Sequence, residues 1–111
     1  MYLEDEKVTP CIDATLACYR ACLGLHSTRR ETISEAFGEL LAECAEVSRE
    51  TAHQLIAGTS EMAVQLVRCA EVSDRCADMG DRISGMTEYA AVCRWCANAC
   101  RDLGAREAKA H

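Results

Sequence analysis

The spacing of the cysteines is the feature that most constrains the fold of this chain. The chain of 111 residues contains nine cysteines. Because an α-helix turns by about 100° per residue, cysteines three, four or seven residues apart lie on nearly the same side of a helix. That spacing places eight of them in three stripes, which are Cys11, Cys18 and Cys22; Cys69 and Cys76; and Cys93, Cys96 and Cys100. We therefore expect thiols to line the inward faces of several helices.

The composition favours helices over strands. Alanine is abundant, only five residues are aromatic, and the single proline is Pro10. Alanine is the strongest helix former, whereas strands are enriched in aromatic and β-branched residues. A chain of this length forms one domain with a modest core. We therefore predict an all-α fold.

Local signals divide the first half of the chain into two helices. Thr9-Pro10 combines a cap residue with a first-turn proline and predicts a helix over residues 9–25. The segment from Thr28 to Glu31 has the form of a capping box and predicts the start of a second helix. That helix is expected to run to about residue 57, with Gly58 placed to end it.

Similar signals predict two more helices. Ser60 is placed to cap a third helix that ends near residue 79, with Gly80 as its terminator. A fourth helix is expected to start between residues 81 and 84 and to end at Leu103, before Gly104. The short connections predict an antiparallel up-down-up-down four-helix bundle over residues 9–104. Residues 1–8, which are acidic, and residues 105–111 are expected to be flexible.

One inward stripe can be traced on each predicted helix by steps of three and four residues. The stripes are Val8, Cys11, Thr15, Cys18, Cys22 and Leu25; Phe37, Leu41, Cys44, Ser48, Thr51 and Leu55; Met62, Leu66, Cys69, Ser73 and Cys76; and Met86, Tyr89, Cys93, Cys96, Cys100 and Leu103.

An antiparallel arrangement also predicts the height of each thiol, from a rise of about 1.5 Å per residue. Cys11 and Cys100 are expected to approach the end that holds the second turn, and Cys76 is expected nearer the other end. Cys18, Cys22, Cys44, Cys69, Cys93 and Cys96 are expected near the middle.

Rows of thiols on continuous helices indicate binding of soft metal ions. Thiolates favour Cu(I), Zn(II) and iron–sulfur clusters. Structural zinc sites place four ligands around one point, and often include histidine. A row of sulfurs better suits Cu(I), which accepts two or three sulfur ligands. We therefore expect Cu(I), with zinc as the alternative metal.

The segments that carry these thiols resemble a known family. They are Cys18-Tyr-Arg-Ala-Cys22, Glu43-Cys44-Ala-Glu-Val-Ser48, Arg68-Cys69-Ala-Glu-Val-Ser-Asp-Arg-Cys76-Ala77 and Val92-Cys93-Arg-Trp-Cys96-Ala-Asn-Ala-Cys100-Arg101. From Cys11 to Cys100 the chain is similar to the bacterial cysteine-rich four-helix-bundle copper storage proteins. The resemblance implies that the nine cysteines bind Cu(I), that the bundles form a homotetramer, and that the protein is a cytosolic copper store.

This chain departs from the family pattern at several inward positions. Ser48 and Ser73 stand where a member richer in thiols would have cysteine, and Thr15 and Thr51 also fall on inward stripes. The resemblance therefore implies a smaller metal load. A structural or oligomeric bundle with residual core cysteines remains an alternative, as does a zinc, iron–sulfur or thiol-redox protein.

Two further residues are candidate metal ligands. His26 follows the Cys18–Cys22 stripe by one turn, near an end of the predicted bundle. Met86 also lies near a helix end, where its thioether could pass Cu(I) into the bundle. A disulfide framework is disfavoured because the number of cysteines is odd and the flanking sequence is helical rather than rich in loops.

Other classes of function find little support in the sequence. The net charge of −6 provides no basic stripe for nucleic acid. The sequence shows neither a secretory signal nor a membrane-spanning run of about 20 apolar residues, so we expect a cytoplasmic protein. No histidine shares a face with the central thiols to activate a nucleophile, so we expect no enzyme activity.

Overall fold

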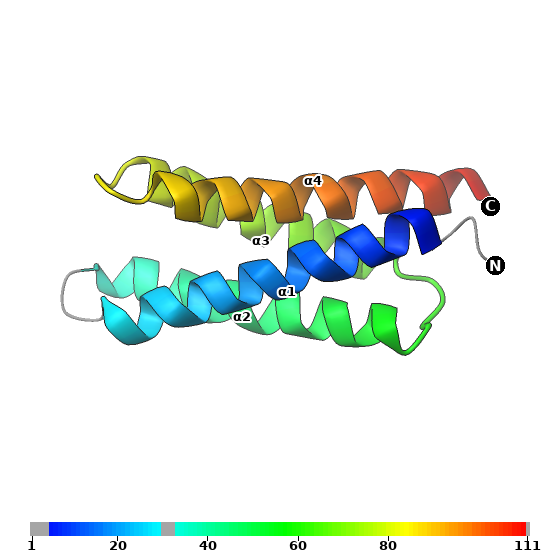
Figure 1. Ribbon diagram of the computed structural model, residues 1–111, viewed down its shortest axis with the longest axis horizontal. Helices are drawn as coiled ribbons and strands as arrows, with labels where there is room; N and C mark the ends of the chain where they lie inside the picture. Colours follow the sequence, from blue (N-terminus) through cyan, green and yellow to red (C-terminus); the bar gives the residue numbers. More distant parts are fainter. Residues whose placement is uncertain (1–4, 30–32, 111) are drawn as a thin grey trace.

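Four helices form an elongated antiparallel bundle. The structure, a computed structural model, describes residues 5–29 and 33–110. Within these ranges the helices are α1 (Asp5–Thr28), α2 (Glu35–Ile56), α3 (Ala63–Asp81) and α4 (Thr87–Ala110). Successive helices run in opposite directions, and α1 begins at the end of the bundle where α4 finishes (Figure 1). The predicted all-α, up-down-up-down fold is therefore confirmed.

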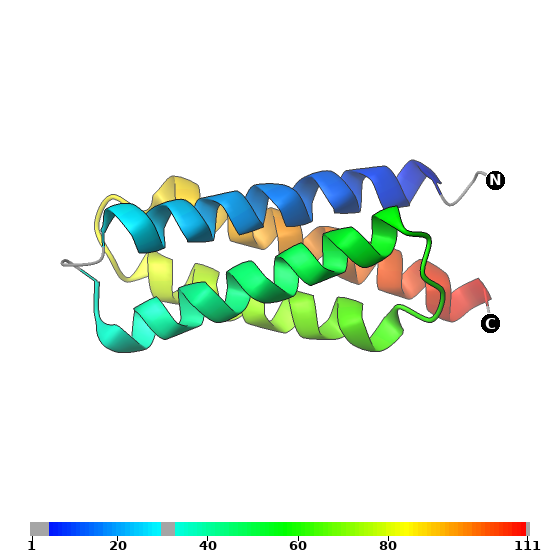
Figure 2. The same cartoon turned by 90° about the horizontal axis from the view of Figure 1, so that it is seen from below.

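The four helices surround one core that extends along the whole bundle. Helix α1 packs on α2 and α4, and α3 packs on the same two helices from the opposite side (Figure 2). The molecule measures 46 × 21 × 19 Å. None of the helices in the described ranges combines the length and the apolar character needed to cross a membrane.

The predicted inward stripes are the core of the bundle. On α2, α3 and α4, and at the two positions just before α3 and α4, every predicted residue is buried. On α1 only the two ends of the stripe, Val8 and Leu25, are half-buried. The period of the apolar and thiol residues therefore predicts the buried face correctly.

The predicted start of the first helix is wrong. Helix α1 begins at Asp5, so residues 5–8 are helical and Pro10 lies inside the helix. Pro10 is the sixth residue of α1, so the backbone hydrogen bond to the carbonyl of Glu6 is missing while the rest of the helix is retained. The local proline signal thus marks the first two turns rather than the first residue.

The predicted capping box does not open the second helix. Thr28 is the last residue of α1, and its Oγ1 donates a hydrogen bond to the carbonyl of Gly24 at 2.8 Å. Residues 30–32, which complete the predicted box, lie outside the described residues. Ser34 caps α2 instead, by accepting a hydrogen bond from the backbone N–H of Phe37 at 3.1 Å.

The third helix begins later than predicted, whereas the second ends where expected. Gly58 follows α2 with a φ of 76° and terminates it as predicted. Ser60 does not cap α3, because Glu61 has a φ of 58° and interrupts the helical backbone after Ser60. The N-cap is Met62, whose side chain makes no capping hydrogen bond.

Two glycines predicted to end helices lie inside them. Gly80 belongs to α3, and a Cβ atom there would lie 3.0 Å from Cδ2 of Tyr89. Gly104 belongs to α4, and a Cβ atom there would lie 3.9 Å from Cβ of Leu66. Both glycines allow close packing, and α4 continues through residues 105–110, which were predicted to be flexible. The turn before α4 contains Gly85, with a φ of 85°.

A candidate metal centre of buried thiols

All nine cysteines lie inside the bundle as free thiols. Each has a relative exposure of 0%. Free cysteine is often buried simply as a small apolar residue. Here, however, the sulfurs also lie close to one another, and the described residues include three groups of potential metal ligands made of cysteine alone.

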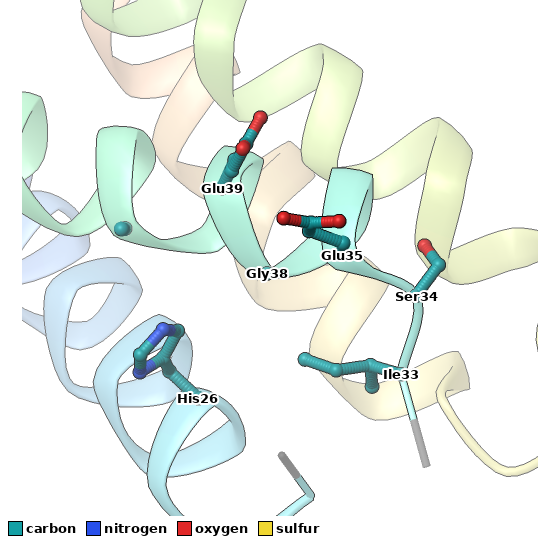
Figure 3. Close-up of a pocket in the computed structure, with 7 residues that line it drawn as sticks. His26, Ile33, Ser34, Glu35, Gly38 and Glu39 are labelled. Carbon is teal, nitrogen blue, oxygen red and sulfur yellow. The ribbon is translucent and has the colours of Figure 1, made fainter. Parts of the chain in front are cut away.

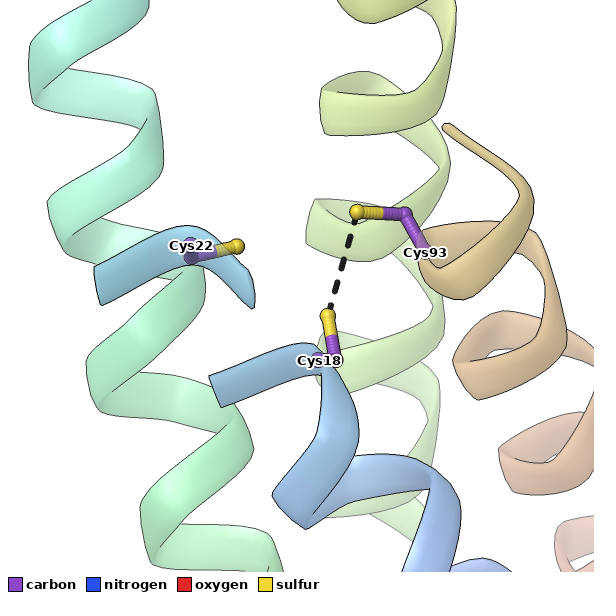
Figure 4. A group of neighbouring side chains, drawn as sticks. All are labelled: Cys18, Cys22 and Cys93. Carbon is purple, nitrogen blue, oxygen red and sulfur yellow. Dashed lines mark hydrogen bonds between the residues drawn. The ribbon is translucent and has the colours of Figure 1, made fainter. Parts of the chain in front are cut away.

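Two of these groups share Cys22. The first contains Cys18, Cys22 and Cys93, and the second contains Cys22, Cys44 and Cys76, with all sulfurs in a group within 4.8 Å of one another. Cys18 Sγ also lies 3.6 Å from Cys44 Sγ and 3.9 Å from Cys93 Sγ. Figure 4 shows the sulfurs of Cys18 and Cys22, from α1, and Cys93, from α4, in the space between the helices. We call these five residues the upper thiol group.

The remaining thiols lie towards the end where α1 begins and α4 finishes. Cys69, Cys96 and Cys100 form the third group, again with all sulfurs within 4.8 Å. Cys11 joins it, since its Sγ lies 3.8 Å from that of Cys100. We call these four residues the lower thiol group.

The grouping of the thiols was not predicted from the sequence. Cys11 and Cys100 lie together, as predicted. Cys69 and Cys96, predicted near the middle, group with Cys100, and Cys76 groups with Cys22 and Cys44. Which thiols meet depends on how the helices pack against one another, and the rise per residue does not determine that packing.

Two serines lie between the upper and lower thiol groups. The Ser73 hydroxyl donates to Cys96 Sγ at 3.4 Å and lies 3.8 Å from Cys18 Sγ. The Ser48 hydroxyl lies 3.9 Å from both Cys44 Sγ and Cys69 Sγ. The serines predicted to replace thiols therefore occupy the positions where thiols would join the two groups.

The two buried threonines are bonded differently. Thr15 Oγ1 donates to the carbonyl of Cys11 at 2.9 Å, and Thr51 Oγ1 donates to the carbonyl of Val47 at 2.7 Å. Such bonds to the preceding helical turn satisfy the hydroxyl within its own helix. Unlike the serine hydroxyls, these hydroxyl protons are directed to the backbone rather than to sulfur.

Apolar side chains cover the thiols at both ends of the bundle. At the end above the upper thiol group, the rings of Phe37 and Tyr89 pack edge to face with centroids 6.1 Å apart, beside the buried Met86. The phenol oxygen of Tyr89 lies 3.5 Å from Cys22 Sγ. At the opposite end, the core is closed by four buried side chains, which are Leu55, Met62, Leu66 and Leu103.

Hydrogen bonding among the thiols separates their acidities. The pKa of Cys22 is raised, first by its hydrogen bond with Cys18 and also by burial. The pKa of Cys18 is lowered by hydrogen bonds with its neighbours, with Cys22 foremost. In the lower thiol group, hydrogen bonds from Cys100 and Cys96 lower the pKa of Cys69 to about 4. The pKa of Cys76 is lowered as well, first by its hydrogen bond with Cys22, so thiols of the same group differ in acidity.

A groove between α1 and α2 was not predicted from the sequence. One cavity, of about 500 Å³, is lined by His26 of α1 and by residues at and before the start of α2, among them Glu35, Gly38 and Glu39 (Figure 3). A second, of about 270 Å³, is lined by nine residues that include Cys22, His26 and Arg49. His26 and Ala42 line both cavities.

The sequence does contain a pattern that could have predicted this groove, which is the spacing of small residues on α2. Gly38, Ala42 and Ala45 recur at steps of four and three residues, so small side chains occupy one face of α2. Small residues on a helix face leave space against the neighbouring helix. Of the two added candidate ligands, His26 is exposed on this groove, whereas Met86 is buried in the apolar end of the core.

The site provides thiolate ligands, which bind soft metal ions. Thiolate sulfur binds Cu(I) and Zn(II) in preference to hard cations. In each of the three groups the sulfurs converge from two or three different helices, so a metal ion bound there would tie the helices together.

Comparison with known proteins agrees with this geometry. Residues 4–105 match the family described as copper storage protein (Csp). The chain belongs to the copper storage protein family. Its buried cysteine groups provide the ligands that a member of this family requires. No curated protein matches the chain.

A solved structure has the same fold. The crystal structure of the Nmul_A1745 protein from Nitrosospira multiformis superposes with a TM-score of 0.87 at 30% sequence identity. The match covers 92% of this chain and 98% of that one. The two proteins are therefore similar along almost their entire lengths.

Proposed function

We propose that this copper storage family member binds and stores Cu(I) through the thiolates of its nine cysteines. The observation that supports this most directly is the convergence of fully buried sulfurs in three groups whose members lie within 4.8 Å of one another. Cysteines placed only to fill the core have no need to converge in this way. Each Cu(I) would be bound by two or three sulfurs, and storage is a binding rather than a catalytic role.

Loading exchanges protons for metal ions. A metal binds the thiolate form of cysteine, so each thiol releases its proton when the metal–sulfur bond forms. Because nine thiols are enclosed in one core, the negative charge of many thiolates must be offset by the bound cations. Metal uptake and thiol ionisation are therefore expected to proceed together.

Zinc is the second candidate metal. Each of the three groups provides three sulfurs, and structural zinc sites take four ligands. The sulfurs also extend along the bundle rather than around one centre, which favours a low coordination number and hence Cu(I). We further propose that the protein is a homotetramer that works in the cytoplasm, where thiols stay reduced.

Anaerobic titration with Cu(I) against a chromogenic chelator tests the function. We expect the reduced protein to withdraw several equivalents of Cu(I) from the chelator. Replacing Cys18, Cys22, Cys93, Cys96 and Cys100 with serine is expected to abolish most of this uptake. Replacing the exposed surface residues Arg20 and Glu71 with glutamine provides a control that should leave the uptake unchanged.

Two results would contradict the proposal. Uptake no greater than the background of the chelator would exclude Cu(I) storage. Zinc that stays bound through purification and is not displaced by Cu(I) would instead favour a zinc protein.

A further inference from the structure

Within the described residues, apolar side chains cover the thiol core at both ends of the bundle. Phe37, Tyr89 and Met86 cover the upper thiol group, with exposures of 1%, 8% and 2%. Leu55, Met62, Leu66 and Leu103 cover the other end, and all are buried. A metal ion that enters along the bundle axis would therefore have to displace one of these apolar layers.

The groove between α1 and α2 approaches the thiols from the side. The cavity of about 270 Å³ is lined by Cys22 together with Tyr19, His26, Ala42 and Arg49, among others. The larger cavity adjoins it, because His26 and Ala42 line both. Cys22 is therefore the thiol that borders the outer surface of the core.

Cys22 also has a central place among the thiols. The upper thiol group consists of two sets of three cysteines, and Cys22 belongs to both. Its sulfur therefore lies within 4.8 Å of those of Cys18 and Cys93 in one set and of Cys44 and Cys76 in the other. A metal ion bound to Cys22 has four other sulfurs in its immediate surroundings. Among the cysteines of these sets, Cys22 alone belongs to two sets and also lines one of the two cavities described here.

The groove offers donors and charge suited to a cation. Glu35 and Glu39 line the outer cavity, and Glu46 lines the inner one. The one arginine of the inner cavity, Arg49, is paired with Glu46 at 2.6 Å, which offsets its charge. His26 provides an exposed imidazole at the wall shared by both cavities.

We propose that Cu(I) enters this protein laterally, through the groove between α1 and α2, and that Cys22 is the first thiol to bind it. This inference rests on the proposed function. The ion passes His26, binds Cys22, and is then transferred to the neighbouring thiols of the upper group. The lower thiol group fills afterwards.

The first step is a ligand exchange without a change of oxidation state. The donor is a Cu(I) complex of a small soluble thiol or chelator. The Cys22 thiol loses its proton and forms the new copper–sulfur bond, while the bond between copper and the donor ligand breaks. A thiolate donor leaves with the released proton, so charge is balanced and copper remains Cu(I).

A blocking substitution separates the rate of loading from the capacity. Ala42 is exposed, and phenylalanine at this position would fill the wall shared by the two cavities without removing a thiol. We expect Ala42→Phe to slow transfer from a Cu(I)–chelator complex by about tenfold, or about 1.4 kcal/mol in activation free energy, with the final stoichiometry unchanged. The matched control is Ala91→Phe, at an exposed alanine of α4 that lines neither cavity.

The outcomes distinguish the route from the function. If wild-type protein takes up no Cu(I), the proposed function fails. If the wild type takes up Cu(I) but Ala42→Phe loads at the wild-type rate, or both phenylalanine variants slow equally, the lateral route is wrong.

A measurement on the unmodified protein provides an independent test. Loading the reduced protein with one equivalent of Cu(I), followed by iodoacetamide and peptide mass spectrometry, identifies the thiols that the first ion protects from alkylation relative to the apoprotein. We expect Cys22 to be protected before the thiols of the lower thiol group. Earlier protection of Cys11 or Cys100, at the far end of the bundle, would overturn the proposal whatever the behaviour of the variants.

Discussion

Ser73 lies among cysteine sulfurs, where a cysteine could bind metal, but its side chain carries a hydroxyl instead of a thiol. Its hydroxyl lies 3.8 Å from Cys18 Sγ, 3.9 Å from Cys44 Sγ and 3.4 Å from Cys96 Sγ. Serine hydroxyls hydrogen-bond to thiols but do not bind soft metal ions well. Position 73 therefore adjoins both thiol groups without adding a sulfur ligand to either.

Converting this serine to cysteine should raise the copper capacity. In Ser73→Cys the new thiol would face sulfurs of both groups, and we expect at least one more equivalent of Cu(I) to be retained against the chelator. Ser73→Ala is the control, since it removes the hydroxyl without adding a donor and should leave the stoichiometry unchanged. An unaltered stoichiometry in Ser73→Cys would show that position 73 lies outside the reach of the bound metal.

The residues of the candidate site could be predicted from the sequence, but their grouping could not. The helical period identifies every cysteine as inward-facing, because a step of three or four residues needs no knowledge of the neighbouring helices. Whether Cys76 meets Cys22 depends on the relative heights of α1 and α3, which contacts across the core determine. The groove beside Cys22 depends in turn on the small residues of α2 and on their distance from α1.

At the level of helices, the packing of glycines explains why the ends of α3 and α4 were predicted too early. Gly58 ends a helix as predicted, whereas Gly80 and Gly104 lie within helices. The difference is the conformation: Gly58 has a positive φ, whereas Gly80 is helical and leaves room for the Tyr89 ring. A sequence signal for a helix end cannot distinguish these two roles of glycine, because the second depends on a neighbouring helix.

Two helical glycines should respond to alanine in opposite ways. In Gly80→Ala the new Cβ would lie 3.0 Å from Tyr89 Cδ2, and the ring is held by Phe37 and Cys22. We expect this variant to lose about 1 kcal/mol or more of unfolding free energy. Gly24 has open space around its Cβ position, so Gly24→Ala should gain about 0.5–1 kcal/mol from helix propensity. Urea unfolding of the apoprotein measures both, and equal effects of the same sign would contradict the packing argument.

For the whole molecule, the buried thiols link stability to pH. Hydrogen bonds with neighbouring thiols, together with burial, raise the pKa of Cys22, Cys44, Cys96 and Cys100 above the ordinary value of 9.0. Above that pH the unfolded chain loses these protons while the folded protein retains them. The unfolded state is therefore favoured as the pH rises.

We accordingly expect the melting temperature of the apoprotein to fall as the pH is raised above about 9. The copper-loaded protein should not show this loss, because its thiols have already released their protons to form metal bonds. Calorimetry of the two forms between neutral and alkaline pH measures the difference. Parallel decreases in both forms would indicate that groups other than the thiols control alkaline stability.

The ion pairs on the surface connect some pairs of helices and not others. Arg68 and Arg75 of α3 pair with Glu50 and Glu43 of α2, at 3.8 Å and 3.5 Å. Arg94 and Arg101 of α4 pair with three aspartates of α3, which are Asp78, Asp81 and Asp74. All the ion pairs between helices described here thus include α3.

This distribution places α1 outside the ion pairs described between helices. Separating α3 from α2 or from α4 would break ion pairs, whereas none of the ion pairs described here includes α1. The boundary between α1 and α2 also contains the groove that borders Cys22. The lateral groove of this thiol store therefore lies at a helix boundary that the described ion pairs do not cross.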